Sequence, residues 1–319
     1  MTGSLSSRRS FLRAAGMLSG SALVFRHAPG GLLEAVQAGP ADAMRAQLGA
    51  APIETTTLGE RLIMLSGPGG NVVVLHGPDG KLVVDGFVQP AWPRLKAALD
   101  GIDGSPIKSL IDTHWHFDHA DNNANFRLAG AGVIAHENTR TRLMEPHDLM
   151  GMHFDPAPSG ALPTQTFAAG LTLNANGEQT DLRHVAPAHT DTDIFVFFPK
   201  ANVLHMGDVF FNGVYPFIDA STGGHINGMI AGVQAALKIV TAQTKIVPGH
   251  GPLGRRGSLE AYGYMLTTIR DRVQKEKKAG KSLADVQAAK PSADFDAAWG
   301  KGKMAPDAFL ALVYNTVRP

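Results

Sequence analysis

The sequence contains no cysteine. This absence excludes disulfide bonds, thiolate metal ligands and a cysteine nucleophile. An excess of charge of one sign is also absent, because 29 Lys and Arg residues stand against 28 Asp and Glu residues. The only basic run lies at the beginning of the chain, so we expect no nucleic-acid partner. Because cysteine is absent, any bound metal must be held by histidine and carboxylate side chains.

The N-terminal region lacks an apolar run long enough to cross a membrane. The uncharged stretch from Ala14 to Phe25 has 12 residues, whereas a spanning helix needs about 20. It follows the basic segment Ser7–Arg13, SRRSFLR, which resembles a twin-arginine export signal. The resemblance implies that residues 1–40 are a signal peptide and linker, that the export machinery is a partner, and that the protein is periplasmic without a stable membrane anchor. The alternative is a basic amphipathic N-terminal helix.

Hydrophobic residues make up 44% of the 319-residue chain, which is enough for a substantial core. After a linker-like segment to about residue 55, Gly-Pro turn signals separate three strand patterns. We expect one α/β domain over residues 41–319, with a helical extension from about residue 280. Residues 145–163 show no hydrophobic period and predict a mobile loop. One option is that this loop lies over the site. The expected strands are 61–66, 71–76, 81–85, 107–112, 132–135, 171–173, 182–186, 194–198, 203–206 and 245–247, and the expected helices are 92–99, 138–145, 228–240, 257–279 and 305–317.

Residues 113–122, THWHFDHADN, concentrate metal-binding side chains directly after a predicted strand. His114 and His116 point to the same side of an extended chain, because side chains alternate with a period of two. Asp118 and His119 lie where the chain turns, so they can face a different centre. The spacing therefore predicts two adjacent metal positions.

Three later segments each place one further candidate at or beyond the end of a predicted strand. These candidates are His189 in APAHTDTD, Asp208 in LHMGD and His250 in VPGHG. Functional side chains in α/β domains are usually built at such strand ends. Each residue alone would more often be structural, but together and in this order they indicate a metal site.

Residues from about 55 to 255 resemble the metallo-β-lactamase-fold hydrolases. The resemblance implies a four-layer αββα sandwich with the metals between the edges of two sheets. It also implies that the first metal is held by His114, His116 and His189, that the second is held by Asp118, His119 and His250, and that Asp208 bridges them. Histidine and carboxylate ligands favour two zinc ions, with iron or manganese as alternatives.

Two positions depart from common family patterns. Asn122 stands where many members have glycine, and we expect the turn to survive because Asn tolerates a left-handed conformation. True β-lactamases of the family generally lack the bridging aspartate, so Asp208 favours the thioesterase and glyoxalase-type members.

The resemblance predicts an exported dinuclear zinc hydrolase. A metal-bridging hydroxide, oriented by Asp118, would attack the carbonyl of a small-molecule ester, thioester or lactam-like bond. One alternative is a true β-lactamase. Another is a non-catalytic metal-binding accessory protein of a periplasmic oxidation system, although such a protein has no need for an open coordination position.

Six further residues are weaker candidates. His205, Asp112 and Asp85 follow or end strands and could orient ligand histidines. The alternatives are a core histidine for His205 and capping or turn roles for the two aspartates. The aromatic stretch after Asp208 predicts one wall of a substrate pocket, with an aromatic core cluster as the alternative; its candidate residues are Asn212, Tyr215 and Phe217.

Overall fold

The computed structural model describes residues 39–317 of the chain. The predicted export signal lies outside the described residues. Within residues 39–317, no helix combines the length and the hydrophobicity that crossing a membrane requires.

The first sheet has seven strands in the order β1-β2-β3-β4-β5-β6-β9. Strands β1 to β4 form an antiparallel meander, whereas β5, β6 and β9 join in parallel. Glycine-rich turns separate the meander strands, as the sequence predicts. The bounds are β1 Glu54–Thr57, β2 Leu62–Gly67, β3 Gly70–Leu75, β4 Lys81–Val84, β5 Ile107–Ile111, β6 Gly132–His136 and β9 Gln165–Phe167.

The second sheet has five strands in the order β10-β11-β12-β13-β14. The first four are antiparallel neighbours, and β14 pairs in parallel with β13. Strand β12 is the apolar run IFVFF and is buried at four of its five positions, as expected for a strand covered on both faces. The bounds are β10 Gly170–Ala175, β11 Glu178–His184, β12 Ile194–Phe198, β13 Val203–His205 and β14 Lys245–Val247.

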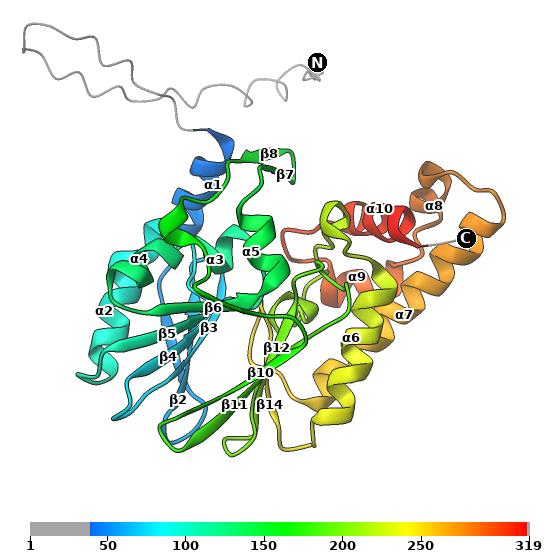
Figure 1. The fold of residues 1–319 in the computed structure, drawn as a ribbon. Helices are drawn as coiled ribbons and strands as arrows, with labels where there is room; N and C mark the ends of the chain where they lie inside the picture. Colours follow the sequence, from blue (N-terminus) through cyan, green and yellow to red (C-terminus); the bar gives the residue numbers. More distant parts are fainter. Residues whose placement is uncertain (1–38, 318–319) are drawn as a thin grey trace, which may run out of the picture. The chain divides into compact units, whose positions relative to one another are not determined.

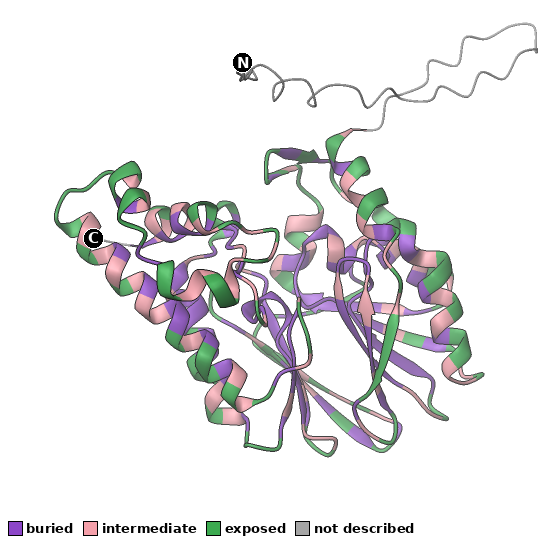
Figure 2. Ribbon diagram, turned by 180° about the vertical axis from the view of Figure 1, so that it is seen from behind, coloured by how far each residue is buried: buried purple, intermediate pink, exposed green. Residues whose placement is uncertain are grey.

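Alternating side chains of the strands divide the core into layers. Val73 and Leu75 of β3 join the cluster between the sheets, which also contains Val196 and Phe198 of β12. Their neighbour Val74 faces the opposite way, toward Leu95 and other residues of the outer helices. The second sheet likewise packs its outer face on α6, α7 and α10. The resulting αββα sandwich confirms the predicted fold class (Figure 1), and its central strands, such as β3, β4 and β12, lie buried between the helical layers (Figure 2).

The helices outside the first sheet include α2 Trp92–Ile102, α3 Phe117–Ala120, α4 Asn123–Leu128 and α5 Glu137–Leu143. The second sheet is covered by α6 Ile226–Ile239 and α7 Arg256–Lys278. The predicted C-terminal helical extension contains α8 Leu283–Ala289, α9 Ala293–Trp299 and α10 Pro306–Thr316. Short 3-10 turns occur at η1 Gln89–Ala91, η2 Ser159–Ala161, η3 Gly207–Val209 and η4 Ala220–Thr222.

Two predicted irregular segments contain regular structure. The segment expected to be linker-like up to residue 55 contains helix α1, Pro40–Gly49, with proline in its first turn. The expected loop 145–163 contains a hairpin of β7 His147–Leu149 and β8 Met152–Phe154. Strands of three residues are too short to show a period. Phe154 stacks on Phe117 with 5.0 Å between ring centroids, so a distant contact supports this hairpin.

Candidate metal centre

Every predicted ligand lies at the same end of the sandwich, because each follows the carboxyl end of a strand. His114 and His116 follow β5, and Asp118 and His119 lie in α3. The other three ligand candidates occupy the loops after β11, β13 and β14, namely His189, Asp208 and His250.

The structure brings the predicted ligands of the first metal together. One ligand atom from each of His114, His116, His189 and Asp208 lies within 4.8 Å of the others. Nδ1 of His116 faces Nε2 of His189 at 2.9 Å, and Nε2 of His189 lies 3.5 Å from Oδ2 of Asp208. All four residues are buried.

The second predicted group, Asp118, His119 and His250, also lies within 4.8 Å of one another. Asp208 stands between the two groups: its carboxylate is 3.3 Å from Nε2 of His119 and 3.3 Å from Nε2 of His250. The side chains of Asp118 and His250 are 15% and 28% exposed. This group is therefore the more accessible one to a substrate.

A metal fits these residues. Among the described residues, Nε2 of His114, Nε2 of His119 and Oδ1 of Asp208 are buried without a hydrogen-bond partner. Burying an unpaired polar atom is costly, and the three atoms converge from two ligand groups. Nitrogen and oxygen donors without thiolate suit zinc, iron or manganese.

In the first group the surroundings favour the neutral imidazoles that bind a metal, whereas in the second group nearby carboxylates favour protonated imidazoles when no metal is bound. Burial lowers the pKa of His114 well below its usual range and brings the pKa of His189 to about 3, so both imidazoles are neutral. Burial would raise the pKa of Asp208, but the neighbouring charges of His250 and His119 hold it well below its usual range. Burial would lower the pKa of His119, whereas the carboxylates of Asp85 and Asp208 raise it well above its usual range.

Asp85, one of the predicted orienting residues, hydrogen-bonds to a candidate ligand histidine. Its Oδ2 accepts a hydrogen bond of 2.8 Å from Nδ1 of His119, which turns Nε2 toward Asp208. The same carboxylate accepts bonds from the backbone N–H and the hydroxyl of Thr113. That hydroxyl lies 3.1 Å from Nδ1 of His114. Asp85 therefore supports histidines of both metal positions.

His205 and Asp112 do not touch the ligand histidines. Nδ1 of His205 accepts from the N–H of Gly207, next to the bridging aspartate, and Nε2 lies 3.3 Å from the carbonyl of Asn71. Asp112 accepts from the amide of Asn123 and so anchors the start of α4. Neither residue hydrogen-bonds to a candidate ligand histidine, so these contacts favour the alternatives, a core histidine for His205 and a turn role for Asp112.

The predicted pocket wall divides into three different environments. Phe217 is half-buried and its ring centroid lies 6.0 Å from that of His116 and 5.9 Å from that of His189. Asn212 is half-buried and donates to the carbonyl of Pro252. Tyr215 is buried, stacks on Phe309 at 4.7 Å and donates to Asp296. Tyr215 therefore belongs to the aromatic core, and its placement in the pocket wall is wrong.

Asn122 keeps the turn after the motif, but for a different reason from the one expected. Its φ of -89° lies outside the left-handed region. Its side-chain amide instead donates to the carbonyls of Gly86 and Val88, at 2.7 and 3.0 Å. Asn122 thus ties the motif to the segment after β4.

One orienting residue has no local signal in the sequence. Asp219 accepts a hydrogen bond from Nε2 of His116 at 3.2 Å, and burial that would raise its pKa is outweighed by His116, which lowers it. Nearby, Nδ1 of His189 lies 2.9 Å from the carbonyl oxygen of Phe217. These contacts join residues far apart in the chain, so neither spacing nor alternation points to them.

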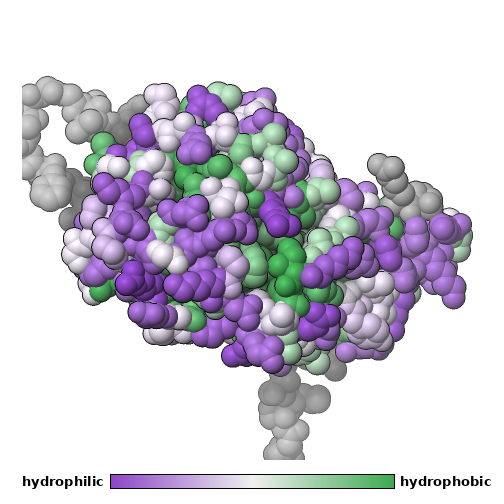
Figure 3. Space-filling view, turned by 60° about the horizontal axis from the view of Figure 1, so that its bottom comes forward, coloured by the Kyte–Doolittle hydropathy of each residue, from purple (hydrophilic) through white to green (hydrophobic). Residues whose placement is uncertain are grey.

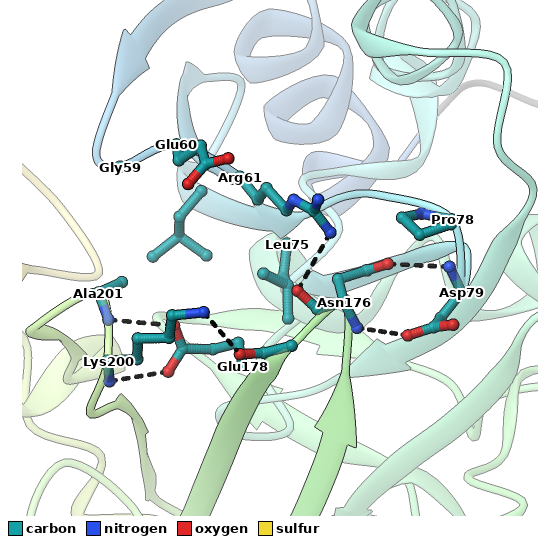
Figure 4. A pocket seen from close by; sticks show the side chains of 12 residues that line it. Gly59, Glu60, Arg61, Leu75, Pro78, Asp79, Asn176, Glu178, Lys200 and Ala201 are labelled. Carbon is teal, nitrogen blue, oxygen red and sulfur yellow. Dashed lines mark hydrogen bonds between the residues drawn. The ribbon is translucent and has the colours of Figure 1, made fainter.

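One surface hollow lies away from the ligand cluster. A hollow of about 550 Å³ lies where Lys200 and Ala201 precede β13, at the opposite end of that strand from Asp208. Its polar side chains bond mainly to backbone groups: Oδ1 of Asn176 accepts from the N–H of Asp79, and Oδ2 of Asp79 accepts from the N–H of Asn176 (Figure 4). Figure 3 shows apolar side chains among polar ones on the face turned forward from the bottom of Figure 1. None of the candidate metal ligands lines the hollow beside Lys200 and Ala201.

The comparisons with known proteins agree with this architecture. Residues 65–258 match the model of the Metallo-beta-lactamase superfamily. A metallo-beta-lactamase from Pontibacter korlensis has 18% identity and a TM-score of 0.57, over 68% of this chain and 99% of that chain. The sec-alkylsulfatase Pisa1 from Pseudomonas sp. has 15% identity and a TM-score of 0.61, over 82% and 50%. At these identities the structural likeness shows the fold alone.

A relative of known sequence is the 2,4-dinitroanisole O-demethylase subunit alpha of Nocardioides sp. (strain JS1661). It is 27% identical over 134 residues, which are 41% of this chain and 38% of the relative. The match thus spans well under half of either protein. The family model, in contrast, covers more than half of this chain, including all seven predicted ligands. The chain therefore belongs to the metallo-β-lactamase superfamily.

Proposed function

We propose that this protein is a dinuclear, zinc-dependent hydrolase that acts on an ester, thioester or lactam-like bond of a small molecule. One observation carries the proposal: two groups of candidate ligands meet at Asp208, and three of their buried nitrogen and oxygen atoms have no hydrogen-bond partner among the described residues. Most members of the superfamily are metal-dependent hydrolases, which supports the reaction class.

The candidate ligands would hold the two metals, and one of them would also orient the attacking water. His114, His116 and His189 would hold the first ion, Asp118, His119 and His250 the second, and Asp208 both. When bound, two such ions lower the pKa of a water toward about 7 and polarise a carbonyl. Asp118, partly exposed and 3.4 Å from Nε2 of His250, is placed to orient the attacking water.

Two other functions remain as alternatives with specific tests. A true β-lactamase shares the fold, but Asp208 between the two ligand groups argues against that specialisation. A non-catalytic accessory protein of a periplasmic oxidation system would need neither seven ligands nor a partly exposed second group. The demethylase relative adds an aryl methyl ether to the substrates worth testing.

We also propose export to the periplasm by the twin-arginine route. The support is the segment Ser7–Arg13, SRRSFLR, and the short uncharged stretch after it. This route carries proteins that are already folded, which suits a chain that binds its metals before export.

The test is metal analysis followed by a substrate panel. Purified full-length protein should contain close to two metal ions per chain, and metal-dependent hydrolysis should appear with an ester, thioester, lactam, phosphodiester, alkyl sulfate or aryl methyl ether. Chelator-treated protein is the control. A metal content near zero despite available zinc refutes the site. Cephalosporin turnover above about 1 s⁻¹ supports the β-lactamase, and inactivity on every substrate at full metal occupancy supports the accessory protein.

A further inference from the structure

The loop between β13 and α6 contacts two of the three histidines of the first metal group. The carbonyl of Phe217 lies 2.9 Å from Nδ1 of His189. Two residues further along, Oδ2 of Asp219 lies 3.2 Å from Nε2 of His116. Nε2 of His116 and Nδ1 of His189 face this loop, whereas Nδ1 of His116 and Nε2 of His189 face each other.

Asp219 is held firmly enough to orient His116. Its side chain is 3% exposed. One carboxylate oxygen accepts from the backbone N–H and hydroxyl of Ser221, and the other from the hydroxyl of Thr222 as well as from His116. A carboxylate with these donors keeps one rotamer and favours the proton of His116 on Nε2, which leaves Nδ1 free for a metal.

The corresponding support of the second metal group comes from a different residue. Asp85, at the end of β4, accepts from Nδ1 of His119 and, through Thr113, also supports His114. Asp219 contacts His116 but neither His119 nor His250 in the described hydrogen bonds and ion pairs. The two carboxylates therefore orient different histidines, and only Asp219 acts on the first group alone.

We propose that Asp219 is a positioning residue for the first metal position, which it stabilises selectively by fixing the orientation and protonated nitrogen of His116. The proposal rests on the proposed metal-dependent function. Removing such a partner from a ligating histidine typically weakens metal binding by about 10–100-fold. The loss should fall on the first ion and leave the affinity for the second nearly unchanged.

Two backgrounds separate the metal positions in the full-length protein. His250→Ala weakens the second position and leaves the first for measurement, whereas His189→Ala does the reverse. Zinc affinity is measured in each background by competition with a chelator, with and without Asp219→Asn. We expect Asp219→Asn to weaken zinc about 10–100-fold in the His250→Ala protein and less than about threefold in the His189→Ala protein.

Asp296→Asn is the matched control for general loosening of this loop. Asp296 accepts from Tyr215, which lies four residues before Asp219, and it touches none of the ligands. This control should keep wild-type affinity at both positions. Equal loss from Asp296→Asn and Asp219→Asn would show a structural effect of the loop and overturn the proposal.

The remaining outcomes are also decisive. Unchanged affinity of Asp219→Asn in the His250→Ala background, or equal loss in both backgrounds, overturns the role of Asp219 while leaving the dinuclear hydrolase intact. Absence of zinc binding by the wild-type protein overturns both. If Asp219→Asn does not fold, NMR of zinc-loaded wild-type protein decides: the Nε2 proton of His116, identified by its loss in His116→Ala, should exchange slowly, and rapid exchange contradicts the proposal.

Discussion

Gly249→Ala tests how tightly the structure constrains the carboxylate between the two metal groups. A Cβ at position 249 would lie 1.8 Å from Oδ1 of Asp208, whereas such contacts essentially do not occur below 3.0 Å. The carboxylate must therefore retreat by about 1.2 Å, and the backbone of Gly207 and Asp208, at 2.8–2.9 Å from the added atom, must shift slightly as well. A misplacement of about 1 Å can cost about 100-fold in rate.

We expect Gly249→Ala to reduce affinity for one metal ion by at least about 10-fold and activity by about 100-fold. The overpacked site should also lose about 1–3 kcal/mol of stability. Metal content, chelator competition and thermal unfolding of metal-free protein measure these effects. Gly257→Ala is the control, because nothing lies within 4 Å of its added Cβ and it lies in the first turn of α7. Wild-type metal affinity and activity in Gly249→Ala would refute the position assigned to Asp208.

Three further predictions concern other parts of the chain. Asp208→Ala should lose mainly the second ion, with a cost of at least about 10–100-fold in affinity, because the first position keeps three histidines; two ions and near-wild-type activity would exclude the bridge. Tyr215→Phe should lower the free energy of unfolding by about 1 kcal/mol through the lost bond to Asp296, and a loss of activity per folded molecule would instead return Tyr215 to the pocket. Fusing residues 1–40 to a reporter should give export that fails when Arg8 and Arg9 become lysine, and unchanged export by the same route would contradict the signal.

The candidate ligands could be located in the sequence because local geometry places them near strand ends, and the family resemblance then assigned them to two metals. His114 and His116 are two residues apart on extended chain, and Asp118 and His119 enter the next turn. Asp208 and His250 follow the short strands β13, VLH, and β14, KIV, whereas His189 follows the largely polar strand β11, EQTDLRH. Strand period and strand ends thus carry most of the information about these seven positions.

Local patterns were insufficient where a residue's environment comes from distant segments. Tyr215 has its hydrogen-bond partner Asp296 81 residues away, so only the packed C-terminal helices assign it to the core. The hairpin β7–β8 has strands too short to show alternation, although Phe154 joins it to Phe117. Helix α1, in contrast, could have been predicted from the sequence, because Pro40 stands at its first position and Gly49 at its end.

The sequence by itself therefore located most strands and the side chains that gather beyond their ends, because alternation and strand ends are properties of neighbouring residues; the sandwich and the set of candidate ligands followed from the family resemblance. Only the tertiary structure decided which carboxylates orient those ligands. Asp85 meets His119 across 34 positions and Asp219 meets His116 across 103. Asp112 ends an apolar strand as Asp85 does, yet it holds Asn123 instead of a ligand. Hydrogen bonds of this kind depend on how the strand ends and the loop after β13 pack against one another, which no local period encodes.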